Sequence, residues 1–195
     1  MSIRQDVRDE EITLDEVQRP FDPTRNSTEP DDWDAAVDAA PAVVVGGGGT
    51  DNSAAVNLMV RIARGELGVC ESPPGSNAGP PLTRYVRYFQ AGLGPLPWCA
   101  FFVSWAWDQA SDQNRRVPWG NPGYVGSVRG WAGKVGRLVS TPIHGDLFGV
   151  GDNHMGIVVG SDPRKRILYT TEGNYSGKVA GVSRPWGGLW FARLA

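Results

Sequence analysis

Cysteine and histidine are scarce in this chain, which has two of each among 195 residues. Cys70, Cys99, His144 and His154 lack the spacing of a zinc site. Two cysteines without a secretory signal also give little reason to expect a disulfide. We therefore expect no metal, no cofactor and no disulfide, with Cys70 packed as a small buried side chain and His144 in a surface turn.

Long hydrophobic runs are also absent. No stretch approaches the roughly 20 apolar residues of a membrane-spanning helix, so we expect no membrane span. The first residues are acidic, and no apolar core of about 7 to 15 residues follows them, so we expect no secretory signal. The sequence therefore predicts synthesis in the cytoplasm.

Charges of the two signs are unevenly distributed. Residues 1–51 contain 13 acidic and 4 basic residues, whereas residues 52–195 contain 8 acidic and 15 basic residues. The resulting charges of −9 and +7 sum to the net charge of −2. We predict an acidic arm over residues 1–50, with glycines 46–49 as a linker, and a basic domain over residues 51–195. The arm is either disordered or docks on a protein partner. The basic domain suits an anionic ligand, but no nucleic-acid-binding motif accompanies it.

The sequence does contain a cysteine at a predicted helix start. The proline-containing segment 94–97 disfavours a helix, and an apolar run with helical spacing begins at Ala100. Cys99 therefore lies where the unpaired N–H groups of a helix N-terminus favour a thiolate. Such a thiolate is the nucleophile of cysteine proteases and amidases, although a free cysteine is equally often a buried apolar side chain.

A histidine and two hydrogen-bond acceptors stand beside predicted strands. His154 begins an apolar, β-branched segment at 154–159, and Glu172 and Asn174 follow a second strand candidate at 167–171. A hairpin of these strands would place Glu172 or Asn174 beside His154, where either side chain could accept a hydrogen bond from the imidazole. The alternative is that residues 172–174 form a simple turn.

Taken together, these segments resemble the CHAP domain, a family of cysteine- and histidine-dependent amidohydrolases and peptidases related to NlpC-type cell-wall peptidases. The resemblance spans residues 54–193. It rests on Pro97 to Trp107, Gly145 to Phe148, His154 to Val159 and Glu172 to Asn174, with an upstream segment around Glu66, Glu71, Pro73, Ser76 and Asn77.

The resemblance implies roles for four residues. Cys99 would be the nucleophile and His154 the general base, with Glu172 and Asn174 as candidates for the group that orients the histidine. Some relatives bind calcium through acidic residues just before the cysteine. Residues 93–98 contain no acidic side chain, so we expect no calcium there.

Substrate-binding residues follow from the chemistry of the nucleophile. A carbonyl attacked by Cys99 needs N–H donors for its developing oxyanion. We expect the backbone N–H of Cys99 to be one donor and a side chain of Ser76 or Asn77 to be another, although this segment could equally be an ordinary loop. Trp98 and Tyr175 are expected to line the substrate groove, with buried packing as the alternative for Trp98.

The predicted fold class is α+β. Helices are expected over residues 53–64, 82–90, 99–110 and 124–134, and strands over residues 146–150, 154–159, 167–171, 178–183 and 189–193. Helices that precede strands without alternation favour an antiparallel sheet. With the family resemblance, this predicts a papain-like domain whose nucleophile lies at a helix start packed on the sheet.

The resemblance also implies a substrate, peptidoglycan. The scissile amide could be the muramoyl-alanine bond or a peptide bond of the stem or cross-bridge. A phage lysin, or an enzyme carried by a phage tail or injection particle, would reconcile cytoplasmic synthesis with this substrate, and the acidic arm would then dock on the particle. Two alternatives remain: a structural tail component whose catalysis is incidental or lost, and a cysteine amidase effector that acts on a substrate outside the wall.

Overall fold

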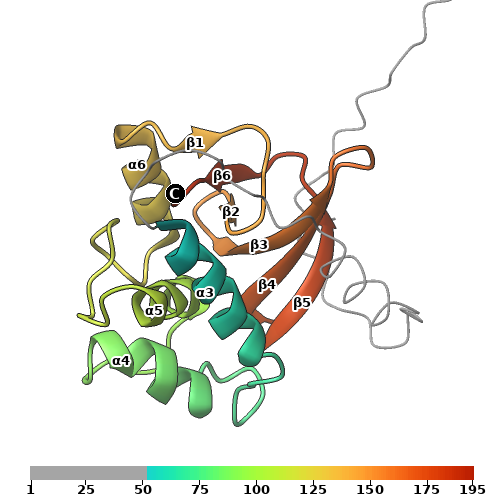
Figure 1. The fold of residues 1–195 in the computed structure, drawn as a ribbon. Coiled ribbons are helices and arrows are strands. Elements are labelled where there is room, and N and C mark those ends of the chain that lie inside the picture. Colours follow the sequence, from blue (N-terminus) through green and yellow to red (C-terminus); the bar gives the residue numbers. More distant parts are fainter. Residues whose placement is uncertain (1–51) are drawn as a thin grey trace, which may run out of the picture.

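The computed structural model describes residues 52–195, so the predicted acidic arm lies outside the described residues. Four segments of residues 52–134 are helical: α3 (Asn52–Gly65), the π-helical turn η1 (Leu82–Val86) with the short α4 (Arg87–Phe89), α5 (Cys99–Ala110) and α6 (Val125–Lys134). In Figure 1, α3, α4 and α5 gather beside the sheet, and α6 lies near β1 and β6.

Six strands follow the helices and form one sheet. They are β1 (Leu138–Val139), β2 (Leu147–Val150), β3 (His154–Asp162), β4 (Ile167–Tyr175), β5 (Lys178–Pro185) and β6 (Trp190–Ala192). Their order in the sheet is β1-β6-β2-β3-β4-β5, and neighbouring strands are antiparallel. The predicted α+β fold with an antiparallel sheet is therefore confirmed.

Helix α5 is the centre of the main core. Ten of its twelve residues are buried because the run from Cys99 to Ala110 is apolar on nearly every side. Its two buried polar side chains have partners, as burial requires. Ser104 donates to the Pro122 carbonyl oxygen at 2.9 Å, and the Asp108 carboxylate accepts from the Tyr88 hydroxyl at 2.6 Å. These contacts hold α5, and with it Cys99, in a fixed place.

The sheet carries a separate apolar cluster besides the core shared with the helices. Met155, Ile157 and Val159 belong to the helix-side core, whereas Phe148, Val158 and Leu168 form part of the second cluster. Successive side chains of a strand point to opposite faces. Thr170 and Glu172, which are two and four residues after Leu168, therefore lie on the same sheet face as the second cluster.

Three details differ from the sequence prediction. The predicted helix 82–90 is divided between η1 and α4, and the short strand β1 was not predicted. Strand β4 continues to Tyr175, so Glu172 and Asn174 lie within it rather than after it. The strand tolerates Gly173 and Asn174 because an irregularity in the pairing with β5 lies between Glu172 and Tyr175. Asn174 takes up this irregularity with a left-handed φ of 59°.

Candidate active site

Cys99 is the first residue of α5. Trp98 precedes it with a non-helical φ of −119° and makes no side-chain cap, so the first N–H groups of the helix remain available beside the thiol. The Cys99 side chain is almost fully buried, and its sulfur lies 4.0 Å from the Asn153 carbonyl oxygen. The nucleophile candidate therefore lies between a helix N-terminus and the turn that connects β2 to β3.

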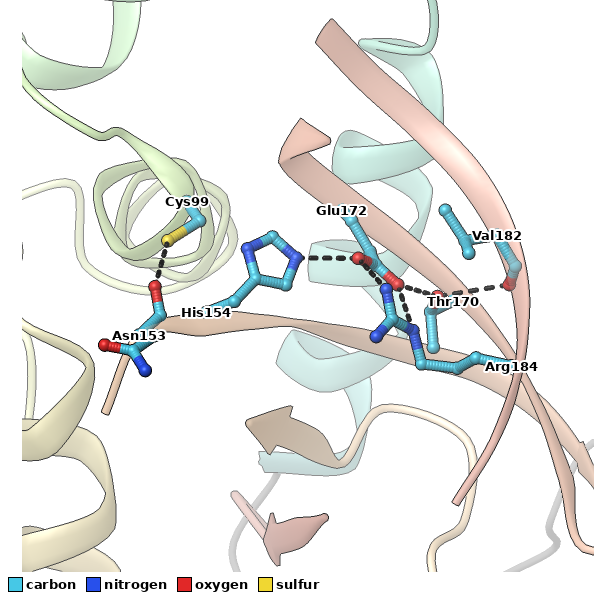
Figure 2. Close-up of polar contacts among 7 residues, drawn as sticks. All are labelled: Cys99, Asn153, His154, Thr170, Glu172, Val182 and Arg184. Atoms are coloured by element: carbon cyan, nitrogen blue, oxygen red, sulfur yellow. Dashed lines mark hydrogen bonds and ion pairs between the residues drawn. The ribbon is translucent and has the colours of Figure 1, made fainter. Parts of the chain in front are cut away.

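His154 is the first residue of β3 and follows this turn directly. Figure 2 shows its imidazole between the Cys99 sulfur and the Glu172 carboxylate, with one ring nitrogen toward each. Its Nε2 lies 2.7 Å from Glu172 Oε2. Burial alone would lower the pKa of His154, but hydrogen bonds to Cys99 and Glu172 outweigh burial and raise the pKa to about 9. The site therefore favours an imidazolium at neutral pH.

Glu172 is a fully buried carboxylate with partners on both oxygens. Oε1 accepts from the Thr170 hydroxyl at 2.6 Å and from Arg184 Nε at 2.8 Å. Oε2 accepts from Arg184 Nη2 at 2.6 Å and faces His154. Burial alone would raise the pKa of Glu172, but the bond to His154, the charge of Arg184 and the Thr170 hydroxyl lower it. The carboxylate therefore remains ionised inside the protein.

Two glycines of the sequence motifs let the three elements approach. A Cβ on Gly173 would lie 2.5 Å from Phe102 Cβ, so a glycine is needed where β4 packs on α5. A Cβ on Gly156 would lie 2.9 Å from Glu172 Cγ, so the missing side chain leaves room for the glutamate to reach across β3 toward His154. These contacts explain why a glycine follows His154 and Glu172 in the two motifs.

Asn174, the other candidate for orienting His154, has a different partner. Its Nδ2 donates to Asn77 Oδ1 at 3.2 Å, which links β4 to the loop after Glu71. Both asparagines have left-handed backbones, with φ of 59° and 51°. This hydrogen bond does not use the side-chain N–H groups of Asn77 or the side-chain oxygen of Asn174, so these atoms can bond to other partners. The orienting contact to the imidazole comes from Glu172.

The expected substrate-binding residues lie in different environments. A pocket of about 310 Å³ beside the imidazole is lined by Val150, Asn153, His154, Asn174, Tyr175, Ser176 and Arg184. That Tyr175 contacts a substrate there stays a prediction. Ser76 donates its hydroxyl to the Pro73 carbonyl oxygen within its own loop.

Trp98 does not line this groove. It is 0% exposed, stacks on Tyr85, and donates from Nε1 to Glu71 Oε1 at 2.9 Å. The expectation that Trp98 contacts substrate is therefore corrected. The side chain before Cys99 points into the core and anchors the loop that leads into α5.

The remaining cysteine and histidine are outside the site. Both thiols are free, and Cys70 is exposed, so the prediction that Cys70 is buried is wrong. His144 Nδ1 bonds to the Val159 carbonyl oxygen at 2.9 Å. Within residues 52–195, no cluster of three or more His, Cys, Asp or Glu side chains is arranged to hold a metal ion. No helix in the same range is long and apolar enough to span a membrane.

Two residues of the site were missed in the sequence. Thr170 and Arg184 both bond to Glu172 from strands of the same sheet. A usable signal for Arg184 was its place in the alternating pattern of β5, where Val182 and Arg184 occupy buried positions. A charged residue at a buried strand position requires a buried partner.

Comparison of the chain with known protein families, with curated proteins and with solved structures found no match in any of the three. The geometry of the site is therefore the basis for assigning a function.

The partners of His154 predict a pH dependence of stability. The pKa of His154 is raised from 6.5 to about 9, so its contribution is present below pH 6.5 and is lost as pH rises through about 9. The pKa of Glu172 is lowered from 4.5, so its contribution is present above that value and is lost in acid. We expect the Tm of the wild type to fall more steeply between pH 6.5 and 9 than that of His154→Gln. Circular dichroism at each pH measures both Tm values. Parallel curves of Tm against pH for the two proteins would contradict this expectation.

The Asn77 contact predicts that Asn174 does not set the state of the histidine. We expect Asn174→Ala to leave the NMR titration of the His154 ring within about 0.3 pH units of wild type, a shift worth less than about 0.5 kcal/mol. Glu172→Gln serves as the positive control and should move the titration clearly. A large shift in Asn174→Ala would assign the orienting role to both residues.

Proposed function

We propose that this protein is a cysteine amidohydrolase or peptidase of the papain-like type that cleaves amide bonds in peptidoglycan. The observation that carries the proposal is the ordered set Cys99, His154 and Glu172, in which the imidazole lies between a thiol at a helix start and a buried carboxylate. Nucleophile, base and orienting group in this order are what thiol-dependent acyl transfer requires.

The reaction begins with the Cys99 thiolate and the His154 imidazolium. The sulfur attacks the carbonyl carbon of the amide, and we assign the backbone N–H of Cys99, at the helix start, as a donor to the oxyanion. His154 then gives its proton to the leaving amine, and a thioester remains on Cys99. Neutral His154 next takes a proton from water, which attacks the thioester and releases the carboxylic acid; the Cys99 thiolate and the His154 imidazolium are thereby restored. Glu172 holds the ring and stabilises the imidazolium in both halves.

The environment of the site supports a peptide or amide substrate. The pocket beside His154 is lined by the polar side chains of Asn153, Asn174, Tyr175 and Ser176. Such groups can bond to the C=O and N–H groups of a peptide on either side of the scissile bond. The net charge of +7 on residues 52–195 favours a substrate that carries free carboxylates, as peptidoglycan stem peptides do.

Delivery to the wall belongs to the same proposal. We propose that the acidic segment 1–50 binds a protein partner, such as a phage tail or injection particle, which carries the domain to its substrate. The alternative route of delivery is that of a lysin, which reaches the wall without a protein partner.

The experiment is digestion of purified peptidoglycan of several wall types by the full chain, with detection of newly formed amino groups. Amino groups that appear with time on at least one wall type support the proposal. A folded protein that is inert on every wall, but hydrolyses an unrelated amide, would favour the effector alternative. A protein inert on all amides would favour the structural tail component.

A further inference from the structure

Arg184 is a buried arginine that contacts the carboxylate behind His154. It lies near the end of β5 and is 9% exposed. Its Nε and Nη2 donate to the two different oxygens of Glu172, at 2.8 and 2.6 Å (Figure 2). A guanidinium bound in this two-pronged way fixes both the position and the plane of a carboxylate.

Aromatic rings hold the guanidinium itself. Arg184 Cζ lies 5.1 Å from the centre of the Phe148 ring and 5.9 Å from that of Tyr175. Guanidinium groups stack favourably on aromatic rings, so the arginine is oriented by residues of β2 and β4 as well as by Glu172. This arrangement makes Arg184 a rigid part of the site.

We propose that Arg184 is a positioning residue of the reaction, which with Thr170 clamps Glu172 toward His154 and supplies the positive charge that lets a thiolate–imidazolium pair form in a buried site. This inference rests on the proposed thiol mechanism. It adds Arg184 and Thr170 to the three residues of the proposed mechanism, Cys99, His154 and Glu172.

The hydrogen-bond capacity of Glu172 supports the clamp. An ionised carboxylate offers about four lone-pair sites, and Glu172 has four contacts: Thr170, His154 and two from Arg184. Thr170 Oγ1 also lies 3.1 Å from the Val182 carbonyl oxygen, but its single proton is better placed for the closer carboxylate. With every acceptor position used, Oε2 cannot turn away from the imidazole without breaking a charged hydrogen bond.

Charge balance supports the second half of the inference. The thiolate and Glu172 carry two negative charges, and the imidazolium and Arg184 carry two positive ones, so the reactive state of the site is neutral. Without Arg184 the same state would leave one uncompensated negative charge in a buried region, which is costly. Thiolate formation would then shift to higher pH.

The titratable and charged side chains around Cys99 and His154 come from several elements. They are Cys99 on α5, His154 on β3, Glu172 and Tyr175 on β4, and Arg184 on β5. Tyr85 on η1 and Glu71 contact the neighbouring Trp98 and are not part of this set. Strand β2 contributes the ring of Phe148. Arg184 is therefore the one permanent positive charge in this set.

A matched control exists beside the same sheet, where Arg193 follows β6. Arg193 makes an equivalent two-pronged contact with the buried Asp146, at 3.0 Å from Nε and 2.9 Å from Nη2. Asp146 precedes β2 at Leu147, whereas His154 pairs with Val150 at the other end of that strand. Loss of the Arg193 contact therefore removes a partly buried ion pair without touching the site.

The test is the pH dependence of Cys99 alkylation by iodoacetamide in the full chain. A Cys70→Ala background leaves Cys99 as the sole thiol, since the sequence has two cysteines. Arg184→Gln, Arg184→Lys and Arg193→Gln are compared with this background, and circular dichroism establishes that each is folded. Alkylation needs no peptidoglycan, so the clamp can be tested even if the proposed substrate is wrong.

We expect the alkylation midpoint of Arg184→Gln to rise by about one pH unit, which lowers the rate about tenfold at pH values below the midpoint. Arg184→Lys should shift less because it keeps the charge but not the two-pronged contact. Arg193→Gln should lose stability but keep the same pH profile of alkylation.

If Arg184→Gln does not fold, Arg184→Lys and Thr170→Val provide the test, and Thr170→Ser is the control that keeps the hydroxyl. Folded Arg184 variants with the background profile, or an equal shift in Arg193→Gln, would overturn the inference. A shifted profile with no wall hydrolysis would uphold the clamp and refute the substrate.

Discussion

Cys99→Ala is expected to abolish amide hydrolysis, with kcat/KM lower by roughly 10⁴-fold or more. In the proposed mechanism the sulfur is the atom that forms the thioester, and the other described thiol, Cys70, does not line the pocket beside His154. Because the alanine removes one small, nearly buried side chain at the first residue of a well-packed helix, the fold should remain intact.

The other cysteine provides the control for this variant. Cys70 is exposed and lies outside the site, so Cys70→Ala should keep wild-type activity and isolate the effect of the nucleophile from any general effect of removing a thiol. Release of amino groups from a cleaved amide, measured on both variants at equal concentration, gives the comparison. Substantial activity in a folded Cys99→Ala protein would eliminate the thiol mechanism.

Glu172→Gln is expected to lower kcat by about 10²–10⁴-fold, with a smaller change in KM. A glutamine no longer stabilises the imidazolium, and one of the contacts now made by its oxygens would involve an amide nitrogen. The same change leaves Arg184 as an unpaired buried charge, so we also expect a stability loss of about 3–5 kcal/mol. Activity assays and denaturant unfolding measure the two effects separately.

A double variant separates the catalytic effect of Glu172 from its structural effect. Replacement of both partners of a buried ion pair by groups of similar volume is often neutral for stability. Glu172→Gln combined with Arg184→Met should therefore recover much of the stability lost in the single variant but none of the activity. Recovery of activity together with stability would assign Glu172 a purely structural role.

The sequence indicated the three residues that the structure brings together, but not the two other side chains that bond to Glu172. Cys99, His154 and Glu172 stand in short motifs, and the glycines of those motifs are explained by close contacts with Phe102 and Glu172. Arg184 lies 12 residues after Glu172, and its contact depends on the register and twist of β5 against β4. No local pattern specifies that register.

Two other predictions failed for local reasons. Gly173 and Asn174 are turn-forming residue types, so β4 was expected to end before Glu172, but the irregular pairing with β5 lets the strand continue through them. Trp98 was placed in the groove because it adjoins Cys99. At a helix start neighbouring side chains point in different directions, and Trp98 points toward Glu71 in the core.

The measurement that tests the central claim most directly is mass spectrometry of the soluble products released from purified sacculi by wild type and by Cys99→Ala. The thiol mechanism on a wall amide predicts that the wild type releases fragments with a new amine and a new carboxyl group at one peptidoglycan amide, and that Cys99→Ala releases none. Fragments cut in the glycan strands with intact stem peptides, or the same fragments from both proteins, would contradict it.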